Sequence, residues 1–228
     1  MWHTELTIWK NISNFARELG ISKELIERAK LDYNNLIGQY AKTRRLVYKR
    51  VQPSKLDASL SMQEFYRWGF NYFPCFFQLI FSGLRYTGLR ESRFYLEASI
   101  RAYHIDSTFR EMAYADKVKM LNIFKPYKSK EDLKSLQTLT GQSLDELKNK
   151  IRFEDMLKGL PQKKEITMFY SDLCNYVHLS EKYQTEALRD NLLNIALQLP
   201  EYEKDKTMLQ RTFDYSICLL LQSLNLAD

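Results

Sequence analysis

The sequence predicts an all-α protein, a multi-helix bundle of about eight or nine helices. Glycine and proline are scarce, with 7 and 5 residues among 228, and both are the usual residues of turns and chain breaks. Leu, Lys, Glu, Ala, Tyr and Phe are abundant instead, a composition that favours long helices over a many-turned β fold. Because 45% of the residues are hydrophobic, the chain can bury a substantial core.

We expect a single helical domain over residues 1–228. Within it the sequence predicts an N-terminal helical hairpin over 1–52, core helices over 61–125 and 162–228, and a helical insertion or lid over 129–160. The insertion is inferred from composition, since this stretch is more polar and poorer in aromatic residues than its neighbours.

The N-terminal hairpin begins with a short amphipathic helix over residues 4–19, which Gly20 ends. Ser22 then caps a much longer helix. Along that helix, side chains suited to packing recur at alternating spacings of three and four, which predicts a heptad-like seam. The seam residues are Ile26, Ala29, Tyr33, Leu36, Tyr40, Thr43 and Val47.

A linker over residues 53–59 precedes the first core helix. Ser61 and Glu64 have the spacing of a capping box, in which each side chain satisfies the other residue's backbone donor. Pro74 should kink the helix that follows, because proline removes one helical hydrogen bond and clashes with the preceding turn. The segment after it, CFFQLIF, is apolar on nearly every side and is predicted to be core.

The helix predicted over residues 84–106 is the element around which the rest is expected to assemble. It is largely apolar, but spacings of three and four place five polar side chains in one broad stripe. They are Arg90, Arg93, Glu97, Arg101 and His104. Buried charges must be paired, because an isolated one costs several kcal/mol. The stripe therefore indicates either a functional site or an internal network that fixes helix packing.

The remaining helices follow in order. A short one is expected over residues 116–124, and two capping-box spacings begin at Ser129 and Ser143. The helix expected over residues 162–180 carries a second polar cluster at spacings of three: Asp172, Asn175 and His178. Two ordinary amphipathic or core helices are predicted at the end, over residues 184–199 and 204–224.

Positive charge is concentrated in the first part of the chain. Residues 1–128 carry 21 Lys and Arg against 12 Asp and Glu, a net +9, whereas residues 129–228 carry 13 against 16, a net −3. The densest basic run ends the long second helix: Lys42, Arg44, Arg45, Tyr48, Lys49 and Arg50. Cations with an aromatic residue suit a phosphate backbone and unstacked bases, although cations also complement the dipole at a helix end.

The sequence lacks the motifs that mark several other classes of protein. There is no glycine-rich phosphate loop, HExxH or GxSxG, so we predict no metal and no cofactor. Three widely spaced cysteines in apolar patterns are typical of buried free thiols in a reducing compartment, and the start has no secretion-signal pattern. The most apolar window, residues 70–84, is shorter than the roughly 20 residues a bilayer requires. We therefore expect a cytoplasmic protein without a membrane span.

Two stretches, RFYLEASIRAYHID at residues 93–106 and FYSDLCNYVHLS at residues 169–180, resemble the paired helical signatures of uncharacterised prokaryotic proteins related to the HEPN group. Members of that group are helical domains of RNases, toxins and defence proteins. The resemblance implies a HEPN-like core in which His178 is the family-like histidine. The nuclease signature also has an arginine shortly before the histidine, and Ser171, Asp172 and Leu173 stand there instead. This departure favours a non-catalytic relative.

Three functional hypotheses follow. The first is a HEPN-like binding module without catalysis that binds RNA, a nucleotide or a protein, either alone or as a homodimer. The second is a metal-independent RNase that uses His178 with Arg93 or Arg101 supplied in space. The third is a structural protein–protein interaction module in which both polar clusters only specify packing.

Overall fold

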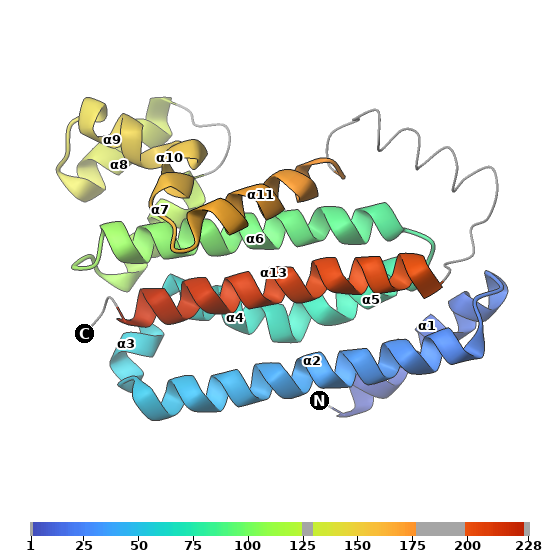
Figure 1. Ribbon diagram of the computed structural model, residues 1–228. Helices are drawn as coiled ribbons and strands as arrows, with labels where there is room; N and C mark the ends of the chain where they lie inside the picture. The colour runs from blue at the N-terminus through green and yellow to red at the C-terminus, as the bar shows by residue number, and fades with distance from the viewer. Residues whose placement is uncertain (1, 125–129, 177–198, 226–228) are drawn as a thin grey trace. The chain divides into compact units, whose positions relative to one another are not determined.

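The computed structural model describes residues 2–124, 130–176 and 199–225, and every regular element in these ranges is helical (Figure 1). The prediction of an all-α protein is confirmed, and the described helices outnumber the eight or nine expected. The described elements are α1 (Trp2–Glu18), α2 (Lys23–Arg50), α3 (Pro53–Asp57), α4 (Leu60–Arg67), the π-helix η1 (Trp68–Tyr72), α5 (Phe73–Phe81), α6 (Arg85–Thr108), α7 (Tyr114–Ile123), α8 (Lys130–Thr140), α9 (Leu144–Ile151), α10 (Phe153–Lys158), α11 (Lys163–Cys174) and α13 (Leu199–Asn225).

The chain divides into two compact units, each assembled from separated segments. Unit 1 consists of Met1–Arg45, Arg67–Tyr95 and Met168–Asp214, and unit 2 consists of Leu46–Tyr66, Leu96–Thr167 and Tyr215–Asp228. Segments distant in sequence therefore contribute to each core, and the residues predicted as an insertion, 129–160, belong to unit 2.

The long helix α2 forms as its sequence predicts. The Ser22 hydroxyl accepts a hydrogen bond of 3.2 Å from the Leu25 N–H, which satisfies one of the free donors at the helix start. All the seam residues except Thr43 are buried, and Thr43 is half-buried. The heptad-like spacing thus identified the face of α2 that is buried.

The core of unit 1 is rich in aromatic side chains. Trp9 of α1, Tyr33 of α2 and Phe77 of α5 contact one another, with ring centroids 5.6 to 5.8 Å apart. Phe73 of α5 meets Phe213 of α13 edge to face at 5.2 Å, a geometry that aromatic rings prefer. In the segment predicted to be core, CFFQLIF, four residues are buried, Phe76, Phe77, Ile80 and Phe81, whereas Cys75 and Gln78 are exposed.

The expected kink at Pro74 takes the form of a π-helical turn. The η1 turn runs directly into α5, and Pro74 lies in the first turn of α5. The Phe73 N–H bonds the Trp68 carbonyl in the wider π-helical turn, which is a common form of distortion within a helix. The ring of Tyr40 packs directly on Gly69 within this turn. A Cβ atom added at Gly69 would lie 2.5 Å from Cζ of Tyr40, so this close approach requires glycine.

Unit 2 corrects two predictions about the start of α4. The linker over residues 53–59 contains the short helix α3. The predicted capping box at Ser61 and Glu64 is wrong, because α4 begins at Leu60 and the Ser59 hydroxyl accepts the hydrogen bond from the Met62 N–H at 3.2 Å. A buried carboxylate from α6 binds the first two N–H groups of the helix, as described below.

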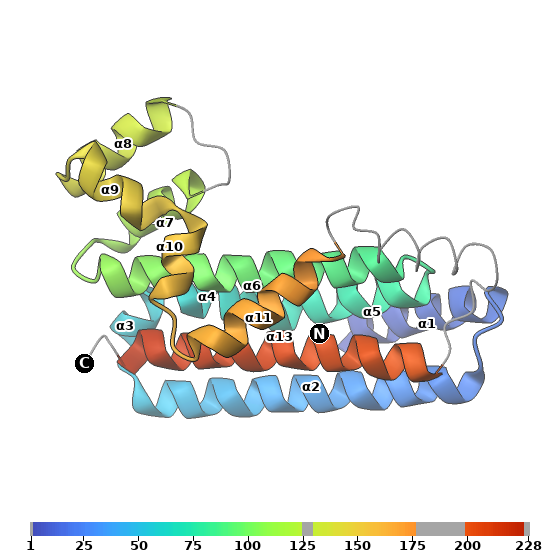
Figure 2. The same ribbon diagram turned by 45° about the horizontal axis from the view of Figure 1, so that its top comes forward.

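Helices α8, α9 and α10 form a small cluster within unit 2 (Figure 2). The capping box predicted at Ser143 is confirmed, since Ser143 and Glu146 satisfy each other's backbone donors. Ser129 lies outside the described residues. Helix α7 starts at Tyr114, two residues earlier than predicted.

The later helices depart from the expected bounds. Helix α11 ends at Cys174, before the predicted residue 180, and the helix predicted over residues 184–199 lies outside the described residues. Helix α13 begins at Leu199 instead of residue 204. The three cysteines are free, but Cys75 is exposed and the other two are half-buried, so the prediction of buried thiols is wrong for Cys75.

Candidate functional site

The five polar residues of α6 do not form one enclosed stripe. Arg90 is exposed, Glu97 is buried, and Arg93, Arg101 and His104 are half-buried. Arg90 and Arg93 belong to unit 1, whereas the other three belong to unit 2. Arg93, Glu97, Arg101 and His104 each have local partners, described in turn below.

Arg93 joins α6 to α11 within unit 1. Its Nη2 donates a hydrogen bond of 2.8 Å to the Tyr170 hydroxyl, and its guanidinium lies 5.3 Å from the centroid of the Tyr170 ring and 5.5 Å from that of Phe94. A guanidinium over aromatic rings is stabilised by their negative faces. The two stretches that carry the HEPN resemblance are thus in contact at this point, which the sequence alone left open.

Arg101 and Glu97 form an ion pair one turn apart on α6, in unit 2. The Arg101 guanidinium also lies 5.9 Å from the centroid of the Phe153 ring on α10. Because the Glu97 carboxylate is buried, the charge of Arg101 offsets a desolvation cost that an unpaired carboxylate would carry. The pair lies within one helix, and both predicted explanations of the stripe, a functional site and a packing network, stay predictions.

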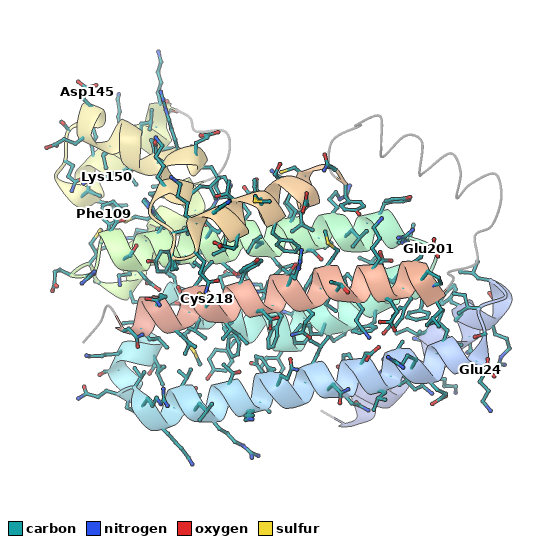
Figure 3. The ribbon with its side chains drawn as sticks, in the orientation of Figure 1. Glu24, Phe109, Asp145, Lys150, Glu201 and Cys218 are labelled. Atoms are coloured by element: carbon teal, nitrogen blue, oxygen red, sulfur yellow. The ribbon has the colours of Figure 1, made fainter. Side chains whose placement is uncertain are left out.

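His104 is held by the backbone of α9. Its Nε2 lies 2.7 Å from the Lys150 carbonyl oxygen, which requires a proton on Nε2 because a carbonyl only accepts. Lys150 also places its ammonium 6.0 Å from the Phe109 ring centroid (Figure 3). Burial lowers the pKa of His104 below its usual 6.5, so the ring is neutral at pH 7. This environment is that of a hydrogen-bonded structural histidine.

The second predicted cluster is described only in part. Asp172 and Asn175 are exposed, and His178 lies outside the described residues. The predicted combination of His178 with an arginine stays a prediction.

An extensively bonded polar group, the Asp106 carboxylate, was not predicted from the sequence. The buried Asp106 carboxylate accepts hydrogen bonds from four groups in unit 2: Ser59 Oγ at 3.0 Å, the Leu60 N–H at 3.2 Å, the Ser61 N–H at 2.9 Å and Ser223 Oγ at 2.9 Å. The buried Lys117 ammonium of α7 adds a fifth contact at 3.5 Å. A carboxylate at a helix start accepts hydrogen bonds from N–H groups that have no partner within the helix. Its negative charge is also stabilised by the positive end of the helix dipole.

A signal for this network exists in the sequence. Ser92, Ser99 and Asp106 recur every seventh residue and are all buried, so they share one face of α6. Ser99 bonds Ser216 of α13 at 3.0 Å, and Asp106 bonds Ser223, both across 117 residues of sequence. The later residue of α6 thus pairs with the later residue of α13, so the two helices run in the same direction within unit 2.

A small hollow beside this network is not a ligand cavity. It is lined by Ser61, Phe65, Ser99, Ser216, Leu219 and Leu220, and it does not admit a sphere the size of a water molecule. The Asp106 network therefore joins helices and offers no space for a substrate.

The basic segment of α2 is a predicted site whose residues are all exposed. We use this name for six exposed residues: Lys42, Arg44, Arg45, Tyr48, Lys49 and Arg50. No acidic residue occurs between Gln39 and Lys55. In unit 2, the Tyr48 hydroxyl forms a hydrogen bond with the Tyr66 hydroxyl of α4.

Three comparisons with known proteins add no relative. A scan against protein-family models, a search of curated proteins and a search of solved structures found no match. Among the described residues, no group of three or more His, Cys, Asp or Glu is placed to hold a metal ion. In the same ranges, no helix combines the length and apolar character needed to cross a bilayer.

Proposed function

We propose that the protein is a non-catalytic nucleic-acid-binding protein that holds RNA through the basic segment of α2. The observation that carries this proposal is the exposure of all six predicted side chains on one helix, in a stretch without acids. Cations on such a surface bind phosphates and release condensed counterions, which is the main source of sequence-independent affinity.

A purely structural role accounts for only part of the basic segment. Lys49 and Arg50 lie in the last turn of α2, where they complement the helix dipole. That effect decays within one turn, so it gives no reason for Lys42 or Arg45. Neither of these two residues forms an ion pair with another described residue.

The surroundings of the α6 residues support the non-catalytic form of the proposal. Glu97 is paired with Arg101 on the same helix, and the Nε2 of His104 is engaged by a backbone carbonyl. A general acid or base must reach the proton that it transfers, and this nitrogen already has a partner. Binding without catalysis is also what the HEPN resemblance implies for a chain lacking the signature arginine.

The proposal is tested by measuring RNA binding with fluorescence anisotropy across a salt series, without added metal. The test variant carries Lys42→Gln, Arg45→Gln and Lys49→Gln. Its matched control carries Lys130→Gln, Lys163→Gln and Lys164→Gln, which remove the same charge from exposed positions elsewhere. Because each neutralised phosphate contact contributes about −0.7 to −0.9 to the slope of log K against log salt, we expect a slope shallower by about 2 and at least tenfold weaker binding.

The control should bind within about twofold of wild type if the basic segment is the site. Equal losses in both triple variants would refute the assignment, because they would reflect net charge alone. Gel analysis of the RNA after incubation tests catalysis separately. Cleavage by wild type that His178→Ala abolishes would replace the proposal with the RNase hypothesis.

A further inference from the structure

From Tyr48 we infer that the nucleic acid bound by the basic segment is single-stranded, with one unpaired base stacked on the Tyr48 ring. This inference rests on the proposed function and names its ligand class. Tyr48 is 46% exposed, whereas the other two tyrosines of α2, Tyr33 and Tyr40, are each 4% exposed. The exposed tyrosine is thus the one that lies among the cations.

The Tyr48 ring is held in place at the surface. Its hydroxyl is bonded to the Tyr66 hydroxyl of α4 within unit 2, so the far end of the side chain is anchored while nearly half of its surface faces solvent. An anchored ring loses less conformational entropy on binding than a freely rotating one, which makes it a better stacking surface. Every base has a π-face, so such stacking is tolerant of sequence.

Cations lie on the same side of the helix as the ring. Arg45 and Arg44 precede Tyr48 by three and four residues, the spacing of neighbours on a helix surface, and both are exposed. One nucleotide can place its phosphate against a cation while its base lies on the aromatic ring, the combination that proteins use for unpaired strands.

A duplex cannot use this arrangement. In A-form RNA the base faces are stacked within the helix, and proteins recognise it mostly through phosphates, 2′-hydroxyls and shape. Reaching a base face would require a nucleotide to be extruded from the stack, at a cost of a few kcal/mol. Tyr48 should therefore strengthen binding to a single strand and leave binding to a duplex unchanged.

The alternative is that the only role of Tyr48 is structural, to join α2 to α4 through its hydrogen bond with Tyr66. Two substitutions separate these roles. Tyr48→Phe keeps the aromatic ring and removes the hydroxyl bond to Tyr66, whereas Tyr48→Leu removes both. Phe15→Leu is the matched control, because Phe15 is 50% exposed on α1 and lies outside the basic segment.

The experiment measures the affinity of these variants for a single-stranded RNA of mixed sequence and for an RNA duplex of the same length. Base stacking on an aromatic residue corresponds to a loss of about 5- to 150-fold on removal of the ring. We expect this loss for Tyr48→Leu on the single strand and less than a twofold change on the duplex. Tyr48→Phe, which keeps the ring without its anchor, should show a smaller loss on the single strand, and Phe15→Leu should bind it like wild type. A single strand with abasic nucleotides should bind wild type and Tyr48→Leu equally.

Three results would overturn the inference while leaving the proposed function intact. The first is salt-dependent RNA binding that Tyr48→Leu does not weaken. The second is an equal loss of affinity for the single strand and the duplex. The third is a loss in Tyr48→Phe equal to that in Tyr48→Leu, which would show that Tyr48 only joins α2 to α4. Absence of RNA binding by wild type would overturn both the inference and the proposed function.

Discussion

Asp106 should be the most stability-determining polar residue of unit 2. Four hydroxyl and backbone donors lie within 3.2 Å of its carboxylate, and the buried Lys117 ammonium lies at 3.5 Å. Asp106→Ala would leave that ammonium without its carboxylate partner, and breaking a buried ion pair in this way costs about 3–5 kcal/mol. Loss of the N-terminal cap of α4 adds about 1 kcal/mol.

The expected decrease in the free energy of unfolding is therefore about 4–6 kcal/mol for Asp106→Ala. That is a large share of the roughly 5–15 kcal/mol that stabilises a typical protein. Asp106→Asn is the milder change, because the amide keeps one oxygen that accepts hydrogen bonds. We expect it to cost about 3 kcal/mol, since its amino group faces donors and the negative charge is lost.

Lys117 gives the sharper comparison. Lys117→Met should cost about 1 kcal/mol or less, because the carboxylate keeps its four other donors. The double variant Asp106→Asn, Lys117→Met should lose less free energy of unfolding than the two single variants lose together, by about 1–3 kcal/mol. The reason is that no ammonium then remains buried without a carboxylate.

Urea unfolding followed by far-ultraviolet circular dichroism measures all four variants. The test is whether substitutions of Asp106 lower the free energy of unfolding more than the substitution of Lys117 does. Two results would contradict these expectations: a decrease below about 1 kcal/mol for Asp106→Ala, or a cost for Lys117→Met equal to that for Asp106→Asn. Loss of the Asp106 charge leaves a buried ammonium unpaired, whereas loss of Lys117 leaves a carboxylate that keeps four donors.

Three further predictions concern packing, pH and capping. Gly69→Ala should lower the free energy of unfolding by about 1–3 kcal/mol, because its Cβ would lie 2.5 Å from the Tyr40 ring. Gly38→Ala should raise the free energy of unfolding by about 0.5–1 kcal/mol, because nothing lies within 4 Å of the added Cβ. Urea unfolding of both variants measures this difference. The lowered pKa of His104 means that the unfolded chain binds the proton more tightly. The stability of wild type should therefore fall as the pH drops below about 6.5, and His104→Gln should reduce that fall in a pH series of urea titrations. An unchanged pH dependence would count against a neutral, buried His104. Ser143→Ala removes the confirmed capping box and should lower the melting temperature by the equivalent of about 1 kcal/mol, whereas no change would show that α9 does not depend on this cap.

The elements that the sequence predicted well are those determined by neighbouring residues. The buried seam of α2 follows from spacing along one helix, and the Ser143 capping box follows from residues three apart. The exposure of the basic segment agrees with its composition. In each case the physical cause lies within a few residues of the predicted feature, so periodicity and local hydrogen bonding suffice.

The features that were missed depend on residues distant in sequence. The start of α4 was placed at Ser61 because the competing carboxylate, Asp106, lies 45 residues away. The polar stripe of α6 was predicted from spacing, but spacing did not identify the partners of its residues: Arg93 bonds Tyr170 of α11 and His104 bonds the Lys150 carbonyl of α9. Spacing identifies which side chains share a helix face, and it does not identify the helix that packs against that face.

The parallel pairing of α6 and α13 sets an order on biosynthesis. Ser223 follows Asp106 by 117 residues, so at about 5–20 residues per second a ribosome makes it roughly 6–23 seconds later. During that interval Asp106 can engage Ser59 and the start of α4, which are already synthesised, while the face of α6 that receives α13 stays uncovered. The nascent chain therefore exposes the apolar residues of that face for seconds, the period in which a chaperone that binds apolar segments would act on it.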